Sequence, residues 1–177
     1  MKIIRLVFLL VLIAEYSYSQ ENKIPVVNYS GKIEMGFLKF SGRLIKIDPG
    51  PGWKGYNLDD KQNGIDMNIV NGISLLKKKV FVGVGFGYLN FEGINGYSLF
   101  SDFEYIPLTK RLSPLLNLKI GYAHIWNQYL DGRSTGLTEL GIGVNYFITG
   151  KYSIYLKTGL LFTQQSHLTP IRIGFRF

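Results

Sequence analysis

The chain has 177 residues, a length that favours one domain, and its 46% hydrophobic and 15% aromatic content is more apolar material than a disordered chain carries. The absence of cysteine excludes disulfides, thiolate metal sites, a cysteine nucleophile and the lipid anchor of bacterial lipoproteins. The formal net charge of +8 suits an anionic membrane or a nucleic acid as a partner, and the export signal described next argues against nucleic acid.

The first residues have the features of a signal peptide. Two basic residues precede a short apolar run at 6–14, and small residues just before Gln20 suit a signal peptidase. The run is too short for a spanning helix, which needs about 20 apolar residues. We therefore expect the mature chain to begin near Gln20, outside the cytoplasm.

Eight segments of roughly ten residues then alternate apolar and polar side chains with a period of two, the pattern of half-buried β-strands. In the first segment, Ile33 and Met35 alternate with Lys32 and Glu34. The links after the second, fourth and sixth segments are short, and those after the odd-numbered segments are polar and often longer. An even number of strands puts both chain ends on the side of the short turns. The segments cover residues 31–40, 63–75, 79–90, 96–106, 114–127, 137–148, 151–163 and 169–177.

A soluble β-sandwich and a membrane β-barrel share this alternation, and four features favour the barrel. The segments reach the length that tilted membrane strands need. Their polar face combines glycine with charge, which suggests a confined interior. Aromatic residues gather near the segment ends on the apolar face, as expected where a barrel meets two membrane interfaces. These are Tyr105, Tyr146, Tyr152 and Phe177 on the short-turn side, and Tyr88, Tyr97, Trp126 and Phe162 on the long-loop side.

The fourth feature is the nearly balanced charge of the polar face. A closed interior has to pair its charges, because an unpaired buried charge is strongly destabilising. We therefore predict an all-β fold, an eight-stranded antiparallel up-and-down transmembrane β-barrel, with a packed, salt-bridged lumen and no continuous wide pore. Arg172 and Arg176 are expected to pair with Glu34, Asp102, Glu104 or Glu139. The full set comprises Lys32, Lys119, Lys157, Arg172 and Arg176 against Glu34, Asp66, Asp102, Glu104 and Glu139.

The exported start, the eight segments and the terminal sequence IRIGFRF resemble small outer-membrane β-barrel proteins of Gram-negative bacteria. Phe177, with Phe175, Ile173 and Ile171 at alternate positions, looks like the C-terminal signal that this family presents to the barrel-assembly machinery. The SYSQ region and the strands rich in Gly and Tyr look like members from Bacteroidetes-type bacteria.

The resemblance implies a location in the cell outer membrane. It also implies contact with outer-membrane lipid and lipopolysaccharide, and transient binding to the assembly machinery; we expect a monomer. The chain then divides into a signal peptide (1–19), a short periplasmic segment (20–30) and the barrel domain (31–177).

The family is functionally mixed, so the resemblance gives fold and location but no activity. We expect a non-enzymatic protein that is structural or interacts through its extracellular loops. The alternatives are an outer-leaflet enzyme modifying lipid A and a narrow channel for small solutes. His124 and Glu139 resemble parts of the lipid A deacylase site, but Trp126 stands at the position of the nucleophile and Glu139 faces the lumen. No catalytic residue is therefore expected.

No cofactor or metal site is expected either. The GVGFG sequence at 83–87 lies inside a strand with no helix after it, which argues against a nucleotide-binding loop. His167 has no second ligand nearby, and Asp59 and Asp60 fit a solvated loop better than a calcium site.

Two groups of turn and loop residues complete the prediction. The basic turns at 77–79 and 110–111 are interpreted as charges that keep strands from sliding into lipid and from pairing at their edges. Trp53 and Tyr56 lie in a loop rich in Gly and Pro and are candidates for contact with a glycan or a partner protein. The same loop could instead fold back and cap the mouth of the barrel.

Overall fold

The computed structural model describes residues 27–43, 63–108, 110–126, 133–163 and 166–177. Among these residues, no helix is long and apolar enough to cross a membrane. The predicted signal peptide, the loop residues Trp53 and Tyr56, and the pair Asp59–Asp60 lie outside the described residues.

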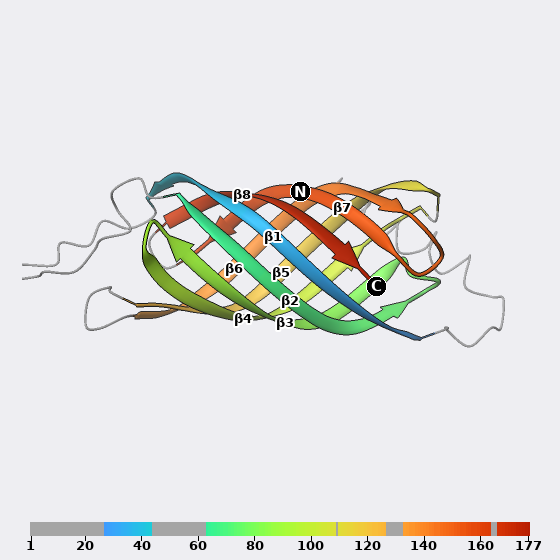
Figure 1. Ribbon diagram of the computed structural model, residues 1–177, viewed down its shortest axis with the longest axis horizontal. Helices are drawn as coiled ribbons and strands as arrows, with labels where there is room; N and C mark the ends of the chain where they lie inside the picture. Colours follow the sequence, from blue (N-terminus) through green and yellow to red (C-terminus); the bar gives the residue numbers. More distant parts are fainter. Residues whose placement is uncertain (1–26, 44–62, 109, 127–132, 164–165) are drawn as a thin grey trace, which may run out of the picture.

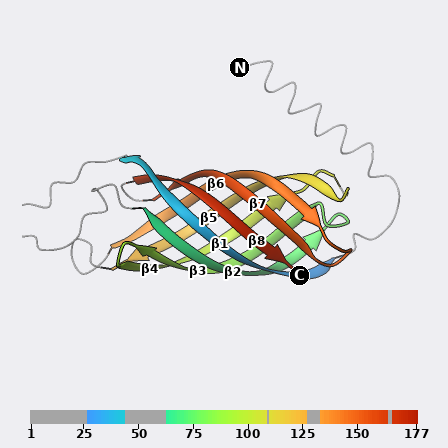
Figure 2. The same cartoon turned by 45° about the horizontal axis from the view of Figure 1, so that its top comes forward.

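Eight β-strands close into one barrel (Figure 1). Each strand pairs antiparallel with the next along the chain, and the first pairs with the last. The turned view in Figure 2 shows that β8 ends, and β1 begins, at the end of the barrel where β2 leads into β3. The predicted eight-stranded antiparallel up-and-down barrel is confirmed. The strands are β1 (Asn28–Arg43), β2 (Gly64–Leu75), β3 (Val80–Phe91), β4 (Ile94–Tyr105), β5 (Leu112–Ile125), β6 (Arg133–Phe147), β7 (Ser153–Phe162) and β8 (Ser166–Arg176).

Side chains point inward and outward in alternation, and most of the large apolar ones point outward. On β2, Ile65, Met67 and Ile69 are 54%, 49% and 57% exposed, whereas Asp66 and Asn68 are each 2% exposed. Such a wide apolar exterior is unstable in water and needs a hydrocarbon environment. A soluble sandwich would bury these apolar residues, so the distribution excludes the sandwich alternative.

The link between β3 and β4 is shorter than predicted. The predicted segments 79–90 and 96–106 left five residues between them, whereas Glu92 and Gly93 alone join the two strands. Both residues have positive φ angles, 51° and 100°, which is the geometry that matches the twist of a two-residue hairpin. The Asn90 amide donates to Asn95 at 2.7 Å across the base of the turn and holds it closed.

Strand β1 is longer than predicted, because it extends three residues beyond each end of the segment 31–40. Backbone pairing continues there although the side chains no longer alternate in polarity, since ladder hydrogen bonds do not depend on side-chain type. Near its far end, between Phe40 and Gly42, the pairing of β1 with β8 shifts register.

Apolar clusters occupy the lumen on both sides of its charged centre. At the end of the barrel that carries the β3–β4 turn, nine buried residues pack together, among them Leu38, Phe91 and Ile125. At the other end, Ile106, Leu115 and Tyr155 form a smaller cluster. Neither cluster was predicted from the sequence. Both lie near the strand ends, where inward positions carry apolar side chains instead of the polar ones expected there.

Candidate functional site

Seven of the eight strands contribute charged side chains to the middle of the lumen. The inward positions of the alternation carry them there, and none of the ten is more than 4% exposed. Strand β3 instead contributes glycines on this face, which leaves room for the long side chains opposite. The structure therefore brings every charged residue of the predicted set into one compartment: Lys32, Glu34, Asp66, Asp102, Glu104, Lys119, Glu139, Lys157, Arg172 and Arg176.

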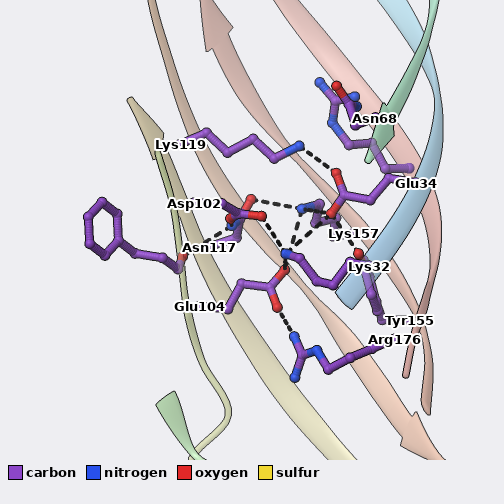
Figure 3. Close-up of polar contacts among 12 residues, drawn as sticks. Lys32, Glu34, Asn68, Asp102, Glu104, Asn117, Lys119, Tyr155, Lys157 and Arg176 are labelled. Atoms are coloured by element: carbon purple, nitrogen blue, oxygen red, sulfur yellow. Dashed lines mark hydrogen bonds and ion pairs between the residues drawn. The ribbon is translucent and has the colours of Figure 1, made fainter. Parts of the chain in front are cut away.

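Glu34 on β1 is the centre of this lumen network (Figure 3). Its carboxylate accepts hydrogen bonds from Lys119 and, at 2.7 Å, from Lys157. The Tyr155 hydroxyl donates to the same carboxylate at 2.6 Å. Because these donors come from β5 and β7, Glu34 ties opposite walls of the barrel together.

A second group surrounds Lys32, also on β1. Its ammonium donates to Asp102 and, at 2.7 Å, to Glu104. Asp102 in turn accepts from the Asn117 amide at 2.6 Å. Glu104 pairs on its other side with Arg176, one of the partners expected for that arginine.

Arg172 on β8 holds the third group. Its Nε and Nη2 donate to the two Glu139 oxygens at 3.0 and 2.6 Å, a bidentate geometry that only arginine provides. Its Nη1 pairs with Asp66, which also accepts from Asn68 at 2.8 Å. Glu139 was among the expected partners of Arg172, whereas Asp66 was not.

Three carboxylates of the network, from Glu34, Asp102 and Glu104, come within 4.8 Å of one another, close enough for a metal ion. The Lys32 ammonium already lies among them, 3.6 Å from Glu34 and in hydrogen-bond contact with the other two. A lysine charge thus stands where a cation would bind. The arrangement cross-links the barrel wall and leaves no acidic group of this cluster free.

His124 lies on the outer face, as expected from its position in the alternation along β5. Its ring packs between Tyr97 and Trp126, with ring centroids 5.5 and 5.4 Å away. Its Nδ1 lies 2.9 Å from the Ser134 hydroxyl on β6, a neighbour that the sequence analysis missed because it depends on the β5–β6 register. Glu139 is inside the barrel with Arg172, and in the described part of the chain no carboxylate bonds to His124.

Aromatic residues of the two predicted girdles lie on the outer face near the strand ends. At the end of the barrel where β8 ends, Tyr152 stacks on Phe175 at 5.8 Å, and Phe175 stacks on Phe177 at 6.2 Å. Ile171, Ile173, Phe175 and Phe177 of the predicted assembly signal all point outward, between 39% and 62% exposed. Their recognition by the assembly machinery stays a prediction.

No known protein family matches the sequence, and no curated protein matches it. Solved structures do match. Neisserial surface protein A (NspA) superimposes with a TM-score of 0.61 over 85% of this chain and 97% of its own, at 12% sequence identity. The fold is that of a small outer-membrane β-barrel. The N-terminal β-barrel domain of Pseudomonas aeruginosa OprF gives a TM-score of 0.54, covering 84% of this chain and 97% of that domain, at 15% identity. At such identities the likeness concerns the fold alone.

Proposed function

We propose that the chain is a non-enzymatic integral protein of the outer membrane of a Gram-negative bacterium. Its barrel would serve as a rigid body that presents loops at the membrane surface, with both chain ends on the periplasmic side. The observation that carries this proposal is the inverted barrel, apolar outside and ion-paired inside. Such a body suits a bilayer, and its interior holds charges paired with each other.

Two further observations support a structural or interacting role over a channel. The charged centre spans the lumen from β1 to β5 and β7, so side chains occupy the path that a solute would take. Apolar clusters then lie on both sides of this centre. A polar solute would have to displace both kinds of packing.

One observation favours a second candidate, an enzyme that modifies lipid in the outer leaflet. The 2.9 Å contact between His124 Nδ1 and the Ser134 hydroxyl is the spacing of a base and a nucleophile. The pair lies on the outer face, where an acyl chain could approach. It lacks an orienting carboxylate among the described residues, and so we rank this candidate second.

Comparison of lipid A from cells with and without the protein, by mass spectrometry, separates the two candidates. We expect identical lipid A in both, and also in cells producing the Ser134→Ala variant. A lost or added acyl chain that disappears with Ser134→Ala would instead establish the enzyme. Fractionation of the same cells tests location, and recovery of the heat-modifiable protein with the inner membrane would contradict the proposal.

A further inference from the structure

A polar cavity lies at the end of the barrel where β1 begins and β8 ends. Its volume is about 340 Å³, which falls within the range of roughly 300–1,000 Å³ typical of small-ligand sites. Three cationic side chains line it, and none of the described lining side chains is acidic. Apart from two tyrosines, the polar lining comprises Asn28, Ser30, Ser74, Lys78, Lys151, Ser153 and Arg176.

Two buried donors in this lining have unmet hydrogen bonds. Arg176 is 4% exposed, and its Nη2 pairs with Glu104, but its Nε and Nη1 have no hydrogen-bond partner. In Figure 3 one guanidinium nitrogen points toward Glu104 and another points away from the network. Ser153, directly opposite Arg176 in the β7–β8 register, is 1% exposed and its hydroxyl is also unpaired. Buried donors without acceptors are unfavourable, so a ligand oxygen here would relieve both.

The rim of the cavity is held by an unusual turn. Leu76, Lys77 and Lys78 have φ angles of 50°, 56° and 69°, a left-handed run that residues other than glycine rarely adopt. Strain of this kind persists only where the surroundings fix it, and it is enriched at functional sites. The Lys78 ammonium donates to the Gly150 carbonyl in the β6–β7 turn, next to Lys151. Two turns far apart in sequence thus bring two ammonium groups to one rim.

We propose that this cavity, here named the terminal cavity, binds a phosphate group. An arginine fork, two lysine charges and a hydroxyl donor match the several acceptor oxygens and the negative charge of phosphate. Tyr29, Tyr152 and Phe177 line the same cavity, and aromatic side chains gather at the depth of lipid headgroups. The phosphate therefore comes either from a phospholipid headgroup or from a free phosphate compound in solution.

The test uses the full chain folded in a maltoside detergent and phosphate-free buffer containing about 0.15 M chloride, which screens non-specific attraction. Inorganic phosphate and short-chain phosphatidylglycerol are added in separate titrations, and amide and arginine Nε–H signals are followed by NMR. We expect a saturable shift at Ser153 and Arg176 with at least one probe. A shift with inorganic phosphate identifies a free compound as sufficient, and a shift with the lipid alone identifies the headgroup.

Variants of the rim and wall establish the site. Ser153→Ala, and the double change Lys78→Gln with Lys151→Gln, should each weaken binding about tenfold, the effect of losing a hydrogen bond to a charged group. All three side chains lie outside the lumen network, so these variants retain its ion pairs. Lys110→Gln is the matched control, because it removes a lysine from another turn at the same end that does not line the terminal cavity. The proposal is overturned if neither probe gives a saturable shift, or if Lys110→Gln weakens binding as much as the rim change.

Discussion

Glu34 is fully buried and accepts hydrogen bonds from three side chains, Lys119, Tyr155 and Lys157. A buried ion pair in isolation is weak support for stability, because desolvation of the charges offsets their attraction. Removal of one partner is strongly destabilising, because the charges that remain are buried and unpaired. The main effect of losing Glu34 would therefore come from the buried lysine charges that lose their negative partner.

The first prediction concerns the variant Glu34→Gln. It leaves two buried lysines short of a negative partner and should lower the free energy of unfolding by about 3–5 kcal/mol. Urea unfolding in lipid vesicles, followed by tryptophan fluorescence, measures the change. Glu92→Gln, which alters an exposed glutamate in the β3–β4 turn, is the control and should change stability by less than about 0.5 kcal/mol. Equal stability of the two variants would contradict the assigned role of Glu34.

The second prediction concerns Gly174, over which the Tyr155 ring lies so closely that a Cβ atom would overlap the phenol. Gly174→Ala should displace the ring, break its 2.6 Å hydrogen bond to Glu34 and cost about 1–3 kcal/mol of unfolding free energy. Gly150→Ala is the control, because no atom lies within 4 Å of a Cβ built there. The control should be neutral or slightly stabilising. An equal loss of unfolding free energy in both variants would contradict the role assigned to Gly174.

The position of a residue in the two-residue alternation was enough to predict which charged residues face inward, because a strand cannot turn one side chain without turning its neighbours. The partners could not be predicted in the same way. Arg172 meets Asp66 over Gly36 of β1, and that contact depends on the register of β1 with both β2 and β8. The contact of His124 with Ser134 likewise follows from the β5–β6 register, which one sequence does not reveal.

At the scale of the element, β8 joins the two ends of the sheet. It pairs with β7 on one side and with β1 on the other, and its outward side chains alternate with inward arginines. Ile173 lies three residues before the end of this strand, opposite Met35 at the middle of β1, and is 62% exposed. Its surroundings in a membrane are therefore hydrocarbon.

The third prediction tests that environment with Ile173→Lys. A lysine facing lipid near the bilayer midplane should cost about 2–4 kcal/mol, measured by unfolding from lipid vesicles. Val27→Lys is the control, because Val27 is 56% exposed but precedes β1 at the end of the barrel, where the cost falls to about 0–1 kcal/mol. Similar costs at both positions would show that the outer face of β8 does not lie in hydrocarbon.

The elements themselves were predicted to within a few residues wherever polarity alternated. The errors in the predicted strand bounds lie where the alternation of polarity weakens. The ends of β1 are polar on both faces, so alternation stops before pairing does. The β3–β4 turn places Glu92 at a positive φ, which glutamate seldom adopts, so only Gly93 marked the turn.

At the scale of the whole molecule, the closed sheet and the filled lumen make one prediction each. The closed sheet has no free edge and should resist detergent until heated. A folded sample should therefore migrate differently from a boiled one in electrophoresis, as measured by gel shift. Identical migration before and after boiling would count against the barrel.

The filled lumen predicts the behaviour of the protein in planar bilayers. Charged pairs at the centre and apolar clusters on both sides should block ions, so we expect no stable single-channel steps. The Gly174→Ala variant, in which one wall residue shifts, is a useful comparison at matched protein concentration. Stable steps with the unaltered protein would contradict the packed lumen.

The position of Glu34 also bears on the order in which the barrel is assembled. Its partners Lys119 and Lys157 follow it by 85 and 123 residues, so a sheet made of the first four strands contains neither. A half-formed sheet would have to keep this carboxylate hydrated, and an apolar bilayer offers no water for it. Insertion should therefore be a late, concerted event in which the first and last strands meet while the lumen charges are enclosed together.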